Sequence, residues 1–568
     1  NIEEILSKQR ILIDYEPEIS GLAEHFAQII IRNKLREQNE IKDAGLVEEK
    51  KLESRYETVD INSMTTSHGR TTGLEHIALY HLKQLGFFEI LESCNFNKEQ
   101  QKYAAAQICS RLVHPDSERE TARWLRQSSA MDELLDTDFS SISDHTLHRV
   151  ADKLLENKDT IEQKLSTNTR ELFSLNDSLI FYDLTNTYFE SPKRTSKLAK
   201  YYRSKEKRND CPVVTLALLV DEMGFPKKSR IFEGNVAEGN TLFEMLEELS
   251  PKGTCDKPKT VIIDAGIATE KNLEKLREDE RFEYVAVSKK KISPELFKDS
   301  PIKELEVSTK KKLSIKTVTL ENETFLLCSS EERAEKEEAI FSSKKNKFEK
   351  ELGSLRDGLN KKGTRKKYDY IVERIGRLKE RYKMGKYFNI EVIKENEKAT
   401  DIKWKFLNKP KEPGEYVIRT SRTDLPGEQI SLLHRTLTII ESSFRWMKME
   451  LGMRPNYHQR DDRMSAHIFL SVLAYFVLAP ILNKLNWGGR FIGTKKEKKA
   501  RDWKIPYGLK SLANAMESQT RVTTSFICKD NKRMDIRTTL DADSNQIEIY
   551  KRLKMSSRPL KRIIVKHD

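Results

Sequence analysis

The chain has 568 residues, too many for one ordinary hydrophobic core, so two to four domains are expected. Lys and Arg number 102 against 89 Asp and Glu, and this surplus of +13, with a pI near 9.1, favours a polyanionic partner. The six cysteines are scattered, without a CxxC pair or a neighbouring histidine pair, which argues against a zinc site or a disulfide framework and indicates reduced thiols in a cytoplasm.

The first part of the chain divides into a charged segment and a helical region. Residues 1–70 are charged and weakly periodic, and a loop is expected at residues 63–73. Residues 71–176 place apolar side chains at helical spacing in short stretches separated by Ser and Asp. This pattern predicts a compact all-α domain, for which DNA binding is the functional interpretation and an ordinary helical bundle is the alternative.

One helix of this region carries candidate DNA contacts. Ser143 and Asp144 are possible caps at its start. Three residues lie on its first turns, where a recognition helix contacts DNA: His145, His148 and Arg149.

Residues 177–290 change to an α/β pattern. Alternating and continuous apolar stretches predict three strands followed by helix, strand, helix and strand. The expected strands are residues 178–189, 212–224, 227–235, 259–266 and 282–289, and the expected helices are residues 240–249 and 269–279. Three antiparallel strands followed by alternating helix and strand is the order of the ribonuclease H-like fold.

Residues 291–430 interrupt this pattern with a β-rich insertion that carries an α-hairpin. The two arms of the hairpin have apolar residues spaced four, three and four, at Phe348, Leu352, Leu355 and Leu359 and at Ile371, Ile375, Leu378 and Tyr382. The turn "NKKGTRKK" between them is rich in Lys and Arg. Such a tip is usually solvated, and contact with a phosphate backbone is the functional alternative.

Residues 431–485 resume the core with a helix in "HRTLTIIESSFRWMKMELGMRP". One stripe of this helix is apolar, and a second stripe is polar: His434, Glu441, Arg445 and Lys448. Glu441 and Arg445 alone would form an exposed i,i+4 ion pair. The apolar stretch at residues 468–482 is short for a membrane span and contains Pro480, so a buried core helix and no membrane association are expected. Residues 486–568 form a basic C-terminal region.

Three carboxylates stand on three separate predicted elements. Asp183 lies in the middle of the first strand, Asp264 at the end of the fourth, and Glu441 on the helix. A carboxylate in a buried strand is costly unless a cation meets it, and three converging acids repel one another unless divalent ions lie between them. Two Mg²⁺ ions, for which Mn²⁺ can substitute, would serve an in-line displacement at phosphorus.

With these motifs, the chain resembles the DDE transposases of bacterial insertion sequences, specifically a divergent branch of the IS-four-like superfamily. The resemblance lies in "FYDLTNTYF", "VIIDAGIAT" and "IIESSFRWMKMELGMRPNYHQRDDRMSAHIFLSVLAY" and in the sequence between the first two. It implies a ribonuclease H-like core interrupted by a β-rich insertion, with Asp183, Asp264 and Glu441 as catalytic acids and metal ligands. Lys448 matches the family lysine that contacts DNA near the cleaved end.

The chain departs from the family pattern before the glutamate. His434 and Leu437 stand where the family has Tyr and Arg, and Arg445 and Arg435 are the candidate substitutes. Farther along, Arg460 and Arg463 are candidate phosphate contacts, whereas His467 is expected to be structural.

The resemblance implies cut-and-paste transposition by a cytoplasmic bacterial protein. The DNA partners would be the terminal inverted repeats of its element and a target duplex, bound by a homodimer. Two alternatives are a ribonuclease H-like nuclease or resolvase without strand transfer, and a non-catalytic DNA-binding relic.

Overall fold

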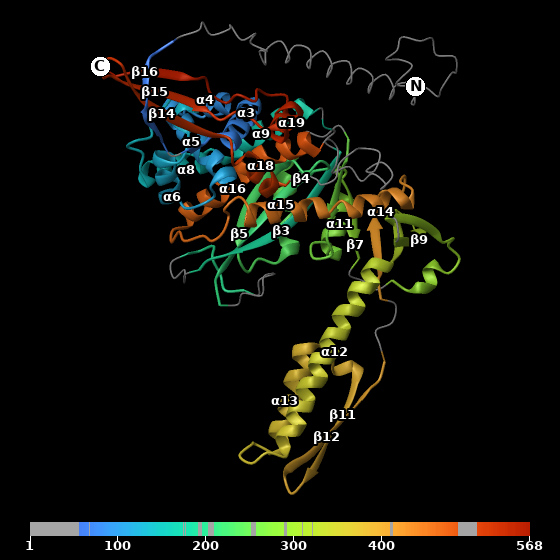
Figure 1. Ribbon diagram of the computed structural model, residues 1–568. Coiled ribbons are helices and arrows are strands. Elements are labelled where there is room, and N and C mark those ends of the chain that lie inside the picture. Colours follow the sequence, from blue (N-terminus) through green and yellow to red (C-terminus); the bar gives the residue numbers. More distant parts are fainter. Residues whose placement is uncertain are drawn as a thin grey trace, which may run out of the picture. The chain divides into compact units, whose positions relative to one another are not determined.

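The computed structural model describes residues 56–67, 69–173, 175, 178–190, 196–202, 210–250, 257–288, 292–308, 311–320, 322–408, 413–486 and 508–567 (Figure 1). Most of the N-terminal charged segment, residues 1–55, lies outside these ranges. The described chain forms two compact units. Unit 1 contains the residues before Tyr284 and those from Thr436 onward, and unit 2 contains Tyr284–Arg435.

A mixed sheet forms the centre of unit 1. Its strands are β3 (Leu179–Tyr188), β4 (Val213–Asp221), β5 (Pro226–Glu233) and β6 (Lys259–Ile263), in the order β5-β4-β3-β6. The first three form the predicted antiparallel meander, and β6 runs parallel to β3. At the turn between β4 and β5, the Asp221 carboxylate accepts from the backbone N–H groups of Met223 and Phe225, both at 2.9 Å. The predicted mixed α/β class is confirmed.

Helices follow the strands in the expected order. They are η1 (Glu238–Asn240) and α10 (Leu242–Leu249) after β5, and α11 (Glu270–Glu278) after β6. Strand β7 (Phe282–Val287) begins in unit 1 and continues in unit 2. After unit 2, the chain returns as α15 (Thr438–Met449), which packs against β3, and α16 (Asp461–Asn486).

Helix α16 is the central helix of unit 1. It is long and apolar enough to cross a membrane, but 94% of its apolar window is buried inside the protein, as expected for a core helix. The helix continues through Pro480 rather than being broken there. A proline removes one backbone hydrogen bond, and burial of nearly every side chain of this helix outweighs that loss.

The N-terminal helices pack around α16. They are α3 (Gly73–Gln84), α4 (Phe87–Ser93), α5 (Lys98–Val113), α6 (Glu118–Gln127), α7 (Met131–Leu135), α8 (Asp144–Glu156) and α9 (Lys158–Phe173). Helices α3, α5 and α8 contact α16 directly, so the helical region shares its core with the residues that follow the Glu441 helix.

The two ends of the described chain form a second sheet in unit 1. Its strands are β1 (Val59–Thr66), β2 (Arg70–Thr71), β14 (Thr520–Cys528), β15 (Arg533–Thr539) and β16 (Ile563–Lys566), accompanied by α18 (Leu509–Met516) and α19 (Ser544–Leu553). The loop expected at residues 63–73 is therefore wrong in part. Thr65 and Thr66 pair with Ser525 and Thr524, a partner so distant in sequence that no local pattern reveals it.

Unit 2 also contains hydrogen-bonded strands. They are β7, β8 (Lys303–Ser308), β9 (Lys311–Leu320), β10 (Glu323–Ser330) and β13 (Glu415–Thr420), in the order β7-β13-β10-β9-β8, with η2 (Pro294–Phe297) and α14 (Gly427–Arg435). Between β10 and β13 the chain forms an arm, defined here as residues 331–413. The arm contains α12 (Glu331–Leu359), α13 (Tyr368–Tyr382), η3 (Gly385–Tyr387), β11 (Phe388–Glu395) and β12 (Lys398–Phe406).

The arm has a hydrophobic core that joins its helical hairpin to its β-hairpin, which lie side by side in Figure 1. This core contains Phe348, Leu352, Leu359, Ile371, Ile375 and Leu378 of the two predicted apolar stripes, together with Phe388, Ala399 and Ile402 of the β-hairpin. At the base of the arm, Gly414 has φ +86°, and a Cβ there would come within 2.5 Å of the Ser330 carbonyl oxygen. The glycine thus lets the chain return beside the start of α12.

Candidate active site

Asp183 and Asp264 occupy matching positions on neighbouring strands. The parallel register of β3 and β6 pairs Tyr182 with Ile263, and each aspartate is the next residue along its strand. Adjacent strands lie about 4.8 Å apart, and residues at the same register position face the same side. The sheet therefore places Asp183 and Asp264 at neighbouring backbone positions, although they are 81 positions apart in the sequence.

Backbone groups orient both carboxylates. Asp183 Oδ1 accepts from the Leu184 N–H at 2.7 Å. Asp264 follows the last residue of β6, and its Oδ1 accepts from the N–H groups of Gly266 at 2.6 Å and Ile267 at 3.2 Å. This local turn ends the strand and fixes the acid at its tip.

Glu441 lies on the exposed side of α15, whose opposite side is buried. Phe444 and Met447 of the predicted apolar stripe are buried, and α15 packs against β3. Among the described residues, the Glu441 carboxylate has no ion pair or side-chain hydrogen bond, so the exposed pair with Arg445 is not formed. An exposed acid without a partner at this place is available to another ligand.

The polar stripe predicted around Glu441 is interrupted at its start. The sequence predicts one helix here, but the structure has two: α14 ends at Arg435 and α15 begins at Thr438. His434 therefore lies on α14 in unit 2, whereas Glu441, Arg445 and Lys448 share α15 in unit 1. The spacing of seven residues between His434 and Glu441 does not place them on one helix face.

A fourth acid, Glu238, lies beside Asp264 and was not predicted from the sequence. A Cβ built on Gly266 would stand 2.2 Å from Glu238 Oε2 and 2.9 Å from Asp264 Oδ1. Thr241 donates to the Glu238 carbonyl at 2.7 Å and accepts from the Tyr182 hydroxyl at 2.6 Å, which ties the turn of η1 to β3. The only sequence signal was an acid shortly after the third strand of the meander.

The candidate DNA contacts differ in their surroundings. Arg445 is exposed and Lys448 half-buried on α15, and His145 and Arg149 are exposed on α8, whose N-cap is Ser143. Two of the arginines have acidic partners: Arg460 Nε donates to Asp462 at 3.0 Å, and Arg463 pairs with Asp152 of α8 at 3.0 Å. His148 packs edge-on against His458, with ring centroids 5.4 Å apart.

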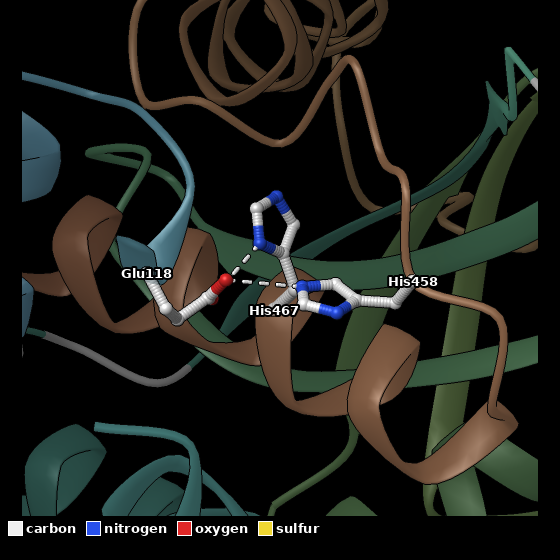
Figure 2. Close-up of side chains that lie close together, drawn as sticks. All are labelled: Glu118, His458 and His467. Carbon is white, nitrogen blue, oxygen red and sulfur yellow. Dashed lines mark hydrogen bonds and ion pairs between the residues drawn. The ribbon is translucent and has the colours of Figure 1, made fainter. Parts of the chain in front are cut away.

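Within the described residues, one set of three acidic or histidine side chains has all its ligand atoms within 4.8 Å of one another: Glu118, His458 and His467 (Figure 2). Asp183, Asp264 and Glu441 do not form such a set. In the Glu118 cluster, the carboxylate lies 3.1 Å from His458 Nε2 and 3.2 Å from His467 Nδ1. Both histidines point toward this carboxylate in Figure 2.

A buried guanidinium makes the Glu118 cluster an internal charge network rather than a metal site. Arg111 Nη2 lies 3.2 Å from Glu118 Oε1 and 3.0 Å from His467 Nδ1, so a cation already occupies this place. The Nε2 of His467 lies 2.9 Å from the Gly452 carbonyl oxygen, which assigns the proton to Nε2 and leaves Nδ1 as an acceptor. The network joins α5 and α6 to α16 and to the loop after α15.

The network perturbs the pKa values of its members. Burial, reinforced by Arg111, lowers the pKa of His467 to about 4. Burial alone would raise the pKa of Glu118, but the hydrogen bond from His458 and the charge of Arg111 hold it well below its ordinary value. His467 is therefore neutral and Glu118 ionised near pH 7.

We expect the unfolding free energy to fall as the pH is lowered from about 6.5 to 4. In this window the unfolded chain binds a proton at residue 467, whereas the folded chain does not. A shift from 6.5 to about 4 corresponds to about 3 kcal/mol. His81, which is buried, and His76, which is half-buried, also have lowered pKa values, so the contribution of His467 is the difference between the wild type and His467→Gln.

Denaturant unfolding at several pH values measures this difference. The stability of His467→Gln should decline less steeply than that of the wild type between pH 6.5 and 4. The matched control is His145→Gln, since His145 is exposed on α8. Parallel curves for the wild type and His467→Gln would refute the assignment of a neutral, buried His467.

Comparison with known families identifies one match. The family described as Transposase DDE domain matches residues 176–477, more than half of the chain. Comparison with curated proteins gave no match. The matched range contains Asp183, Asp264 and Glu441 and includes the whole of unit 2.

Proposed function

This chain belongs to the transposase DDE domain family, and on that premise we propose that it carries out cut-and-paste transposition of an insertion sequence. It binds the terminal inverted repeats of its element in the bacterial cytoplasm as a homodimer, hydrolyses a phosphodiester at each end, and joins the 3′-hydroxyls to target DNA. One observation carries the proposal: Asp183 and Asp264 lie level on adjacent parallel strands, and the Glu441 helix packs against the first of these strands.

We assign Asp183, Asp264 and Glu441 as the catalytic acids and metal ligands of a ribonuclease H-like core. A set of carboxylate oxygens suits Mg²⁺, or Mn²⁺ in its place, better than softer metals. Two such ions, when bound, activate the attacking water or 3′-hydroxyl and stabilise the leaving oxygen. The backbone turn at Asp264 and the amide of Leu184 hold the two aspartates in place for this role.

Positive side chains of unit 1 hold the DNA in this proposal. Lys448 lies two turns after Glu441 on α15 and contacts the phosphate beside the cleaved bond. Exposed Arg445, together with His145, His148 and Arg149 of α8, contributes further contacts. Arg460 and Arg463 exchange their acidic partners Asp462 and Asp152 for phosphates.

Incubation of the full chain with the DNA ends of its own element tests the proposal. With EDTA present, a hydroxyl-radical footprint should cover the terminal repeats. With Mg²⁺, strand-specific cuts should appear at the ends, and a pre-cleaved end should join to a plasmid. Cleavage without joining would favour the nuclease or resolvase alternative, and binding without cleavage would favour a non-catalytic relic.

A further inference from the structure

The distal part of the arm carries a large share of the net positive charge of the chain. Residues 341–408 contain twenty Lys and Arg against ten Asp and Glu, a surplus of ten out of the total of +13. The base of the arm has the opposite sign, since the first ten residues of α12 contain five Glu against one Arg and one Lys. The charge is therefore segregated along the arm, and only its far end attracts a polyanion.

The strongest concentration is at the turn between α12 and α13. This basic tip is defined as Lys361, Lys362, Arg365, Lys366 and Lys367. Four of the five side chains are exposed and that of Lys366 is half-buried, and none forms an ion pair with an acid in the described part of the chain. Some other cations of the arm do have acidic partners, for example Lys394 with Glu397 at 2.9 Å. The tip thus keeps its charge available.

The basic tip is also an ordered structure. Thr364 Oγ1 donates to the carbonyl oxygens of Gly358 at 2.6 Å and Lys361 at 2.9 Å, which closes the turn. The Lys366 carbonyl accepts from the Ala399 N–H at 2.8 Å, so the β11–β12 hairpin supports the tip from the side. Arg365 stacks on the Tyr370 ring, with its guanidinium carbon 5.1 Å from the centroid. Cations fixed on an ordered turn lose less conformational entropy on binding than cations on a flexible chain segment.

The position of the cluster costs stability in the free protein. Lys367 is the N-cap of α13 and offers no side-chain oxygen to the free N–H groups of the helix. The positive end of the helix dipole repels neighbouring cations, and Asp369 is the only acid in the first turn. Five cations at the N-terminal end of α13 therefore lower the stability of the free protein unless an anion binds to them.

We propose that the basic tip of the arm binds the phosphate backbone of double-stranded DNA, as a contact additional to those assigned to the candidate active site. Helix α12 has 29 residues and is about 43 Å long, somewhat more than one turn of B-DNA. The choice of duplex DNA as the polyanion rests on the proposed function. The arm then supplies sequence-independent affinity, whereas base recognition belongs to other parts of the chain.

Salt dependence of DNA binding by the full chain tests this inference. The tip variant replaces Lys361, Lys362, Lys366 and Lys367 by Gln and keeps Arg365 because it packs on Tyr370. The control variant makes the same change of charge at four other exposed lysines: Lys271, Lys298, Lys336 and Lys529. Fluorescence anisotropy with a 40-base-pair duplex, in EDTA and at several KCl concentrations, measures the affinity of each protein.

Loss of four phosphate contacts should lower the slope of log Kd against log salt by about 3.6. Between 50 and 200 mM salt, the affinity of the wild type should therefore fall about 150-fold more than that of the tip variant. The control variant should keep the wild-type slope. Equal slopes for the wild type and the tip variant, or equal losses in the tip and control variants, would overturn the proposal. Tip-dependent binding that is tighter for RNA than for duplex DNA would also overturn it.

These outcomes are separate from those for catalysis. If the wild type shows tip-dependent DNA binding but no cleavage with Mg²⁺, the arm proposal stands and the proposed transposition fails. If the wild type cleaves its element ends and the tip variant binds DNA with an unchanged slope, the arm proposal alone fails.

Discussion

Replacing Asp183 or Asp264 by Asn should abolish cleavage of the element ends while DNA binding survives. Asn keeps the shape of the side chain and an oxygen for the backbone hydrogen bonds from Leu184 or Gly266, so the sheet and the turn remain. The change removes the negative charge that a divalent ion requires. We expect a loss of roughly 10³-fold or more in the cleavage rate, because residues that act as one catalytic unit fail together.

A gel assay with labelled element ends measures both properties in one experiment. Binding is followed in EDTA and cleavage in Mg²⁺, and the melting temperature shows that each variant is folded. The matched control is Asp299→Asn, an exposed acid of unit 2 that undergoes the same change. A folded variant that no longer binds the ends, or one that still cuts them, would contradict the assignment.

The sequence predicted those parts of the fold that depend on local patterns. The meander, β6, the arm hairpin and the buried α16 all have apolar side chains at the spacing of a strand or a helix. Asp183 and Asp264 stood out as candidate metal ligands because an ionised carboxylate in a buried strand, or at the end of one, costs free energy unless a cation compensates its charge. The parallel register of β3 and β6 then places them level, which sequence spacing alone does not fix.

Features that depend on long-range pairing were missed or wrong. The strand at Val59–Thr66 exists because β14 lies beside it, more than 450 residues later. Glu118 has no signal in its own segment, since its partners His458 and His467 come from the other end of unit 1. The break between α14 and α15 was hidden because helical periodicity continues across it.

Glu441 and Lys448 provide the second test, because they share a face of α15 but have different assigned roles. Glu441→Gln removes a metal ligand and should eliminate cleavage almost completely. Lys448→Ala removes a charge-assisted phosphate contact worth about 1.5 to 3 kcal/mol, so the rate should fall about tenfold to a hundredfold. The difference in cleavage rate between the wild type and Lys448→Ala should become smaller as salt is added, since salt screens this contact in the wild type.

The competing interpretation is that this face of α15 is only a solvated surface. It predicts that both substitutions alter the unfolding free energy by less than about 1 kcal/mol and leave cleavage unchanged. The control Glu274→Gln, on the exposed side of α11, shows what the loss of one surface acid does in the same unit. Cleavage rates and melting temperatures of the three variants therefore separate the two interpretations.

A fully active Glu441→Gln protein would remove Glu441 from the catalytic set, but it would leave Asp183 and Asp264 level on their strands. In that case Glu238 is the next candidate for the third acid, because its Oε2 and Asp264 Oδ1 both lie within 3 Å of the point where a Cβ of residue 266 would stand. Glu238→Gln in the same assay then decides. An inactive Glu441→Gln with a melting temperature equal to that of the wild type, beside a partly active Lys448→Ala, assigns the metal to one end of this helix and the DNA strand to the other.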